Sequence, residues 1–104
     1  MLFMVIEYYK DPSAVYMRFQ EKGRMLPSGL LYIGSWVDAD LSRCFQVMKT
    51  YDLRLLKEWI SRWDNIVDFE VVRVLSSEEV QNAMAIYGPK TRAKEKLDRM
   101  ESGR

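Results

Sequence analysis

The sequence predicts an α+β fold of the ferredoxin-like class, in which a βαββαβ chain forms a four-stranded antiparallel sheet with two helices on one face. Three observations predict it. Four segments rich in apolar residues have the length of strands, and two amphipathic segments separate them in the βαββαβ order. The length of 104 residues fits one domain. We expect this domain at residues 1–89, with a C-terminal helix, and a charged, flexible tail at residues 90–104.

The first half of the chain predicts a strand, a helix and a second strand. Residues 2–9 are almost wholly apolar and form the first strand. Asp11 and Pro12 suit the N-cap and the first turn of a helix over residues 14–26. A Pro-Ser-Gly turn ends this helix, and residues 30–38 form the second strand.

The second half repeats the pattern in the order strand, helix, strand, helix. Residues 43–49 form a strand that pairs with the preceding one as a hairpin. Asp52 suits the N-cap of the next helix, whose apolar side chains recur at helical spacing. Those side chains are Leu56, Trp59, Ile60 and Trp63. Residues 66–75 form the fourth strand, and the Ser76/Glu79 spacing predicts a capping box before a helix at 77–87.

The two-residue period of the strands sorts their side chains onto two faces of the sheet. We expect an apolar face beneath the helices, made of Leu2, Met4, Ile6, Leu31, Ile33, Val37, Phe45, Val47, Val67, Phe69 and Val71. We expect a mixed face opposite, made of Phe3, Val5, Glu7, Tyr9, Tyr32, Gly34, Trp36, Cys44, Gln46, Met48, Glu70, Val72 and Val74. The mixed face is too apolar and aromatic to remain in water. A second copy of the chain packed against it would cover it, which predicts a homodimer.

Composition narrows the classes of partner and site. The formal net charge of +1 gives no overall field for nucleic acid, and we expect no nucleic-acid partner. No segment reaches the roughly 18 apolar residues of a membrane span, so we expect no membrane partner. The chain has no histidine and one cysteine, which excludes a catalytic triad with histidine and a histidine or multi-cysteine zinc site. We expect no metal and no cofactor.

The single cysteine, Cys44, also bears on the compartment. One cysteine forms no intramolecular disulfide, and the first residues lack the basic region and cleavage site of a signal peptide. Both features predict a reducing, cytoplasmic location. No histidine is available to activate Cys44, so we expect an inert, buried thiol in preference to a nucleophile or a redox sensor.

Several motifs recur in order along the chain: G-R-M-L-P at 23–27, S-W-V at 35–37, C-F-Q at 44–46, and W-x-x-x-W-x-x-x-V-D-F-E at 59–70. With them, residues 1–75 resemble a bacterial family known as a domain of unknown function. The resemblance implies a dimeric α+β barrel, in which two ferredoxin-like sheets pack together. Distantly similar barrels include antibiotic-biosynthesis monooxygenases, heme-degrading enzymes, stress-responsive proteins and ligand-binding regulators. The fold hosts many functions, so it transfers none of them to this chain.

The polar and aromatic residues of the mixed face are the candidate ligand-binding site. They are Glu7, Tyr32, Trp36, Gln46 and Glu70. An indole and a phenol offer an aromatic wall, an amide both donates and accepts hydrogen bonds, and two carboxylates in one cavity can act as acid and base. The plain alternatives are that the carboxylates pair with an arginine, such as Arg24 or one from a partner subunit, and that Trp36 fills a dimer core.

Three functions are compatible with this sequence. The first is an uncharacterised homodimer that binds a small apolar or aromatic molecule over the sheet face. The second is a cofactor-free enzyme of the monooxygenase type, which would use Glu7, Trp36 and Gln46. The third is a structural or regulatory dimer without a ligand. A pocket lined by Glu7 and Trp36 would favour the first two, and a sheet face filled by side chains would favour the third.

Overall fold

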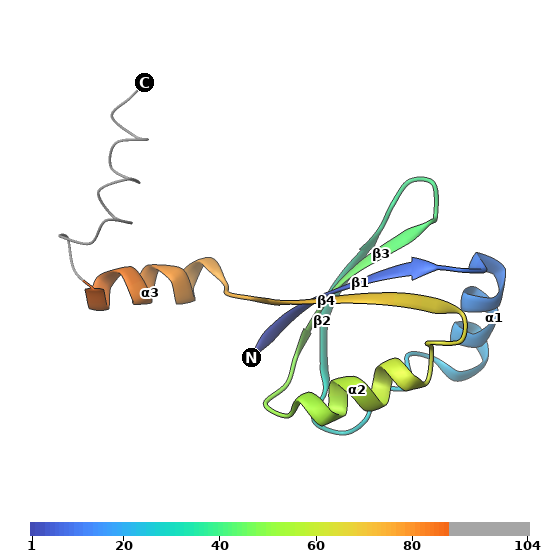
Figure 1. Ribbon diagram of the computed structural model, residues 1–104, viewed down its shortest axis with the longest axis horizontal. Coiled ribbons are helices and arrows are strands. Elements are labelled where there is room, and N and C mark those ends of the chain that lie inside the picture. Colours follow the sequence, from blue (N-terminus) through green and yellow to red (C-terminus); the bar gives the residue numbers. More distant parts are fainter. Residues whose placement is uncertain (88–104) are drawn as a thin grey trace. The chain divides into compact units, whose positions relative to one another are not determined.

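The computed structural model describes residues 1–87, and the predicted tail at residues 90–104 lies outside the described residues. The elements are β1 (Leu2–Tyr9), α1 (Pro12–Lys22), β2 (Leu31–Val37), β3 (Arg43–Lys49), α2 (Leu53–Ser61), β4 (Val67–Val74) and α3 (Ser77–Tyr87) (Figure 1). The chain divides into two units, Met1–Val74 and the part from Leu75 onward. The first unit contains the sheet, α1 and α2, and the second contains α3.

The sheet has the strand order β2-β3-β1-β4, and all three neighbouring pairs are antiparallel. The central strand β1 pairs with β3 through Glu7 and Cys44, and with β4 through Glu7 and Phe69. This topology confirms the predicted ferredoxin-like α+β fold. Because β1 lies between β3 and β4, its side chains occupy the middle of the sheet.

Side-chain caps start the helices where the sequence predicts. Asp11 accepts a hydrogen bond from the backbone N–H of Ala14, and Asp52 accepts one from the backbone of Arg54. Before α3, Ser76 and Glu79 exchange the two hydrogen bonds of a capping box. The capping predictions for all three helices are therefore confirmed.

The first helix ends earlier than the sequence predicts. It stops at Lys22, and Gly23 follows with φ of 65° while donating its N–H to the carbonyl of Phe19. Glycine adopts this left-handed backbone conformation without the steric cost of a Cβ atom, so it terminates the helix. The next residues form a loop in which Met25 also has a positive φ, of 58°. This loop positions Arg24 beside the cavity described below.

The hydrophobic core lies between the sheet and the two helices α1 and α2. Its buried members are Phe3, Val5, Val15, Leu30, Met48, Leu56, Trp59, Trp63 and Val67. As the helical spacing predicts, the apolar stripe of α2 is directed into this core, with Leu56 and Trp59 among its most buried side chains.

The predicted assignment of side chains to the two faces is wrong for β1 and β3. Phe3, Val5 and Glu7 of β1 are buried against the helices, together with Cys44, Gln46 and Met48 of β3. The more apolar set of each strand therefore points to the opposite side. We call that side the outer face of the sheet; it carries Leu2, Met4, Ile6, Phe45, Val47, Trp36, Glu70 and Val72. The prediction assumed that the more apolar set must be buried within one chain.

A β-bulge changes the facing of side chains along β2. The register with β3 shifts between Tyr32 and Gly34, so Tyr32 and Ser35 both lie on the helix side. Trp36 then lies on the outer face, opposite Phe45, where 62% of it is exposed. Strict alternation had placed Trp36 on the same face as Tyr32, and the inserted residue of the bulge is the physical reason for the error.

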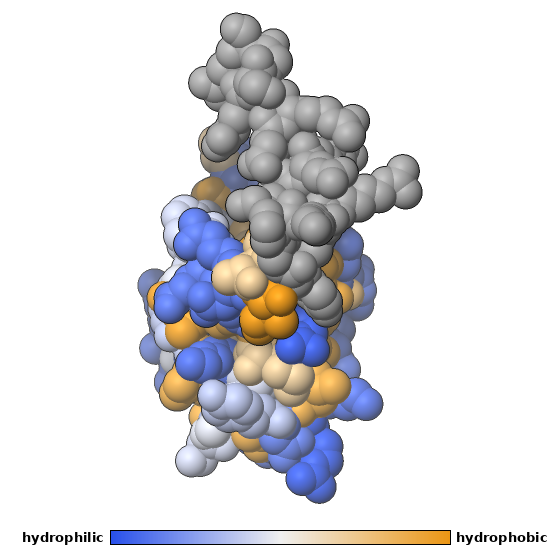
Figure 2. Space-filling model, turned by 90° about the vertical axis from the view of Figure 1, so that its left-hand side faces the viewer, coloured by the Kyte–Doolittle hydropathy of each residue, from blue (hydrophilic) through white to orange (hydrophobic). Residues whose placement is uncertain are grey.

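Other hydrophobic side chains are exposed on the surface as well. Leu31 and Ile33 of β2, which the sequence predicts to lie beneath the helices, each expose more than half of their surface, so that expectation is wrong for them too. Tyr51 and Ile86 are exposed to a similar or greater extent. On the side drawn in Figure 2, hydrophobic residues lie among hydrophilic ones, so charged groups interrupt the apolar surface there. None of the helices within residues 1–87 is both long and apolar enough to cross a membrane.

Candidate functional site

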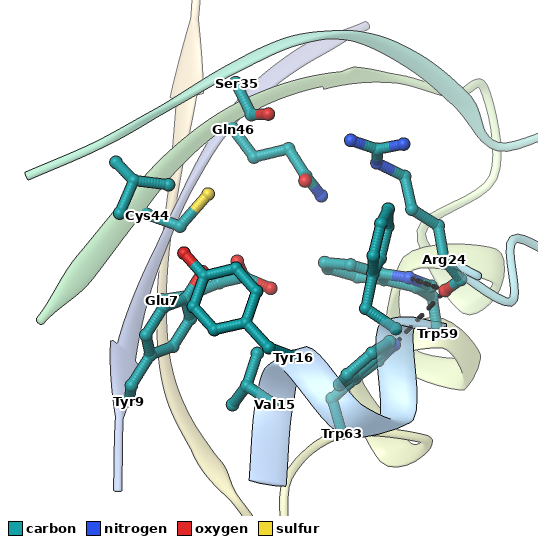
Figure 3. Close-up of a pocket in the computed structure, with 12 residues that line it drawn as sticks. Glu7, Tyr9, Val15, Tyr16, Arg24, Ser35, Cys44, Gln46, Trp59 and Trp63 are labelled. Carbon is teal, nitrogen blue, oxygen red and sulfur yellow. Dashed lines mark hydrogen bonds between the residues drawn. The ribbon is translucent and has the colours of Figure 1, made fainter. Parts of the chain in front are cut away.

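A cavity of about 190 Å³ lies between the sheet and the helices α1 and α2 (Figure 3). Its lining comes from strands β1, β2 and β3, from helix α1 and the loop after it, and from α2 and the residues just after α2. The lining residues are Glu7, Tyr9, Val15, Tyr16, Phe19, Arg24, Ser35, Val37, Cys44, Gln46, Trp59 and Trp63. Five of the twelve lining residues are therefore aromatic, and a small number of polar groups lie among them.

The structure brings together three of the five residues of the predicted ligand site. Glu7 and Gln46 line the cavity. Tyr32 lies at its edge, where its hydroxyl is 2.6 Å from the hydroxyl of the lining residue Ser35. Trp36 and Glu70 lie on the outer face and do not reach the cavity. The expectation that all five share one face is wrong, because of the bulge in β2 and because Glu70 pairs with Ile6 and not with Glu7.

Glu7 is a carboxyl group in a largely apolar setting, with 8% of the residue exposed. Burial raises the pKa of Glu7 above its ordinary value, because the charged form loses water. A hydrogen bond with the Cys44 thiol and the positive charge of Arg24 act in the opposite direction and offset part of this rise in pKa. Glu7 is thus a group whose proton is held more tightly than that of a surface glutamate.

Cys44 is buried beside Glu7, as the sequence predicts for an inert thiol. Burial and the neighbouring Glu7 raise the pKa of the Cys44 thiol to about 12. Tyr9 lines the same part of the cavity, and burial raises the pKa of its phenol as well. The pKa of all three groups is raised, and the Tyr9 hydroxyl and the Cys44 thiol offer O–H and S–H donors at this end of the cavity.

Gln46 places a buried amide in the cavity wall, with 4% of the residue exposed. Its Nε2 group donates to the Met48 sulfur at 3.4 Å. A thioether is a weak acceptor, so this contact satisfies little of the hydrogen-bonding capacity of the amide. A ligand oxygen in the cavity would be a better partner for the same N–H group.

Arg24 lies in a loop that is held in place by three hydrogen bonds, whose donors belong to α2 and the residues just after it. The indole N–H groups of Trp59 and Trp63 both donate to the backbone carbonyl of Arg24, at 2.9 and 3.2 Å (Figure 3). The guanidinium of Arg62 donates to the next carbonyl, that of Met25. Because the donors come from one turn of α2 and the residues just after it, they fix the loop backbone and the point from which the Arg24 side chain extends.

Aromatic rings hold the side chain of Arg24. Its guanidinium carbon lies 3.7 Å from the ring centroid of Tyr32 and 5.1 Å from that of Phe19. Both contacts are cation–π interactions, which leave the N–H groups at the edge of the guanidinium plane available. Within residues 1–87, no carboxylate forms a salt bridge with Arg24.

Sequence reasoning missed several residues of this cavity. Tyr9, Tyr16 and Phe19 are not among the candidates, Arg24 is expected only as a charge partner of the carboxylates, and Trp59 and Trp63 are expected to be core residues only. The two tryptophans are core residues, and they also form part of the cavity wall. The G-R-M-L-P and W-x-x-x-W motifs were the available signal, because these two motifs meet where the indoles contact the carbonyl of Arg24.

The arrangement can enclose one aromatic ring and contact polar atoms on it. Tyr9, Tyr16, Phe19, Trp59 and Trp63 supply apolar ring surface, and Gln46, Ser35 and Arg24 supply hydrogen-bond donors. Glu7 can donate or accept a proton at a ligand atom. Within the described part of the chain, no group of three or more acidic or cysteine side chains gathers in a way that would hold a metal ion.

Comparison with known proteins gives one family match. Residues 1–87 match a family described as a domain of unknown function, DUF3303. The match extends past the 75 residues over which the sequence motifs carry the resemblance, and it covers all of the described elements. No curated protein and no solved structure matches the sequence.

Proposed function

Because the chain belongs to the DUF3303 family, whose description names no activity, we propose a function from the site itself: a homodimer that binds a small aromatic molecule. The ligand would occupy the cavity between the sheet and the helices. This places it over the sheet face that carries Glu7 and Gln46, as expected from the sequence, but beneath α1 and α2 and away from Trp36.

The observation that carries the proposal is the lining of the cavity. Five aromatic side chains surround a space in which two nearly buried polar residues, Glu7 and Gln46, present their functional groups. Burying a polar group costs free energy, about 1–3 kcal/mol when it lacks a partner, and polar atoms on a bound molecule would offset part of that cost for Glu7 and Gln46. An arrangement of this kind is the usual composition of a small-molecule site.

The size of the cavity supports a ligand with a single ring. An apolar cavity of about 150 Å³ in another protein accommodates benzene. The volume here is about 190 Å³, which leaves room for one ring and a small substituent. Ligands with two fused rings would require the walls to move.

The outer face supports the homodimer. Apolar side chains from all four strands lie on it, and an exposed apolar patch of this kind marks an interaction surface. Leu31, Trp36 and Val72 are each more than 40% exposed on it. A second copy packed face to face would bury the same patch twice and remove it from water, as a two-fold dimer requires.

Proton transfer is a second candidate function, in line with the enzyme alternative. Burial raises the pKa of Glu7, and a higher pKa makes its carboxylate a stronger base toward a substrate proton. Glu7 would then take a proton from an acidic group on the ring. This function needs the same ligand in the same cavity, so the binding test below bears on both.

The test of binding uses the tryptophans as reporters. In a Trp36→Phe background, the remaining indoles, Trp59 and Trp63, both line the cavity. We expect toluene, phenol or benzoate to change their fluorescence in a saturable way. Val15→Phe should abolish binding, because Val15 is buried in the cavity wall and a larger side chain fills the space. Met17→Phe on the same helix is the matched control, since Met17 is 60% exposed and outside the cavity. Failure of all single-ring probes to bind would disprove the proposal.

A further inference from the structure

We propose that the ligand is a single-ring aromatic anion whose negatively charged oxygen is bound by the guanidinium of Arg24 and the amide of Gln46. This inference rests on the proposed function, because it names the charge class of the molecule in the same cavity. It assigns to Arg24 the selection of an acidic ligand over a neutral ring of equal shape.

Arg24 differs from three other arginines of the chain in that it has no carboxylate partner in the part that the structure describes. Arg43, Arg54 and Arg62 each form a salt bridge with a nearby carboxylate, at 2.9, 3.0 and 2.8 Å. Arg24 has no such carboxylate among residues 1–87, although it is half-buried and lines a cavity. A cation withdrawn from water without a paired anion is the complement of an anionic ligand.

The protein holds this cation before any ligand arrives. Trp59 and Trp63 bind its backbone carbonyl, and Tyr32 and Phe19 flank its guanidinium. Stacking fixes the plane of the guanidinium and leaves its edge, with paired N–H groups, for a planar oxyanion. Little side-chain entropy then remains to be lost on binding, which raises affinity.

Gln46 supplies the second donor for the same oxyanion. Both residues line the cavity, and in the view of Figure 3 the Arg24 side chain extends past the aromatic rings toward the side of the cavity from which the Gln46 amide projects. The amide N–H now contacts the Met48 sulfur at 3.4 Å, and it would gain a stronger, charge-assisted hydrogen bond with a carboxylate or phenolate. Two donors on one side of the cavity also fix the orientation of the ring.

Glu7 is the one acidic group in the cavity lining, and its protonation state decides whether it opposes an anion. Tyr9, Tyr16 and Cys44 also line the cavity, and the neighbouring Cys44 thiol and the positive charge of Arg24 both lower the pKa of Glu7. Burial is the largest effect on its pKa and favours the acid form. A protonated Glu7 repels no anion and donates a hydrogen bond, so the cavity then carries the net positive charge of Arg24.

The test compares benzoate with benzamide, which have the same shape and differ in charge. We expect calorimetry to give wild-type protein about tenfold or greater preference for benzoate, the ratio that one charge-assisted hydrogen bond supplies. Arg24→Gln should remove the preference and keep the binding of benzamide, which shows that the cavity is intact. Arg24→Lys should retain part of the preference. Lys57→Gln, which removes an exposed cation on α2, should leave the preference unchanged.

The outcomes separate this inference from the function on which it rests. Equal affinity of wild type for benzoate and benzamide would leave ring binding in place and overturn the anion inference. A preference for benzoate that persists in both Arg24 variants would place the anion at another cation and also overturn it. If neither compound binds wild type, the proposed function fails together with the inference. If Arg24→Gln does not fold, the salt dependence of wild type provides the test. We expect the preference of wild type for benzoate over benzamide to be lost at high salt, and a preference that does not depend on salt would contradict the anion inference.

Discussion

Trp59 donates its indole N–H to the backbone carbonyl of Arg24 at 2.9 Å, across 35 residues of sequence. The contact joins the end of α2 to the loop after α1, and Trp63 donates to the same oxygen. A buried carbonyl with two donors is fully satisfied, since it has two lone pairs. The stability of the domain and the position of Arg24 therefore depend on the same pair of side chains.

We expect Trp59→Phe and Trp63→Phe to be non-additive in their effects on stability. Each single change leaves the Arg24 carbonyl with one donor and costs about 1–3 kcal/mol, mostly from lost packing. The double change removes both donors and leaves the carbonyl unsatisfied. Denaturant unfolding should show the double variant less stable than the sum of the singles by about 1 kcal/mol. Simple additivity would show that the shared carbonyl does not couple the two residues.

The stability of Glu7→Gln relative to wild type should depend on pH. Burial raises the pKa of Glu7 in the folded state, so between the unfolded and folded pKa values the folded protein binds more protons than the unfolded chain. Wild type loses stability as pH rises through this window, and glutamine, which cannot ionise, does not. We expect the difference in free energy of unfolding between Glu7→Gln and wild type to be constant below a pH of about 4. Above that pH, Glu7→Gln should become more stable relative to wild type. A difference independent of pH would contradict the raised pKa.

Native Cys44 should react slowly with a thiol reagent. The residue is buried, and its pKa of about 12 leaves only roughly one thiol in ten thousand ionised at pH 8. Labelling followed by absorbance should complete within the mixing time for unfolded protein and take far longer for the native protein. A ligand that fills the cavity should slow the labelling of the native protein further, because Cys44 lines the cavity wall. Equally rapid labelling of native and unfolded protein would show that the thiol is accessible.

Sedimentation should detect a dimer at micromolar concentration, and Trp36→Lys should dissociate it. Trp36 is 62% exposed on the outer face, where a buried lysine charge would oppose the packing of a second copy. Tyr51→Lys is the control, since Tyr51 is 83% exposed and lies outside the strands. A monomeric wild-type protein, or a Trp36→Lys variant that remains dimeric, would exclude the outer face as the dimer contact.

The sequence was sufficient for the order of elements, because periodicity, caps and breakers are local signals. Asp11, Asp52 and the Ser76/Glu79 pair cap helices where the pattern predicts, and the strand order follows from the βαββαβ sequence. The end of α1 was placed too late because the effect of Gly23 was not recognised. A glycine within an apolar stripe either continues a helix or ends it, and local pattern does not decide between the two.

The assignment of the faces could not be predicted in the same way. Counting apolar residues favoured burial of Ile6 and Val47, whereas the helices cover Glu7 and Gln46. Burying polar residues lowers the stability of the fold, so a pattern rule predicts that they are exposed. The rule therefore fails at a binding site, where buried polar residues are required. The bulge in β2, which turns Trp36 away from Tyr32, adds a second, non-periodic change that strict alternation does not detect.

The indole N–H signals in a nuclear magnetic resonance spectrum test the central claim most directly. Three tryptophans report two locations: Trp59 and Trp63 line the cavity, and Trp36 lies on the outer face. Titration of ¹⁵N-labelled wild type with benzoate should shift the Trp59 and Trp63 signals in a saturable way and leave the Trp36 signal in place. Each signal is assigned from the corresponding Trp→Phe variant. A shift confined to Trp36, or no shift at all, would contradict a ligand site between the sheet and the helices.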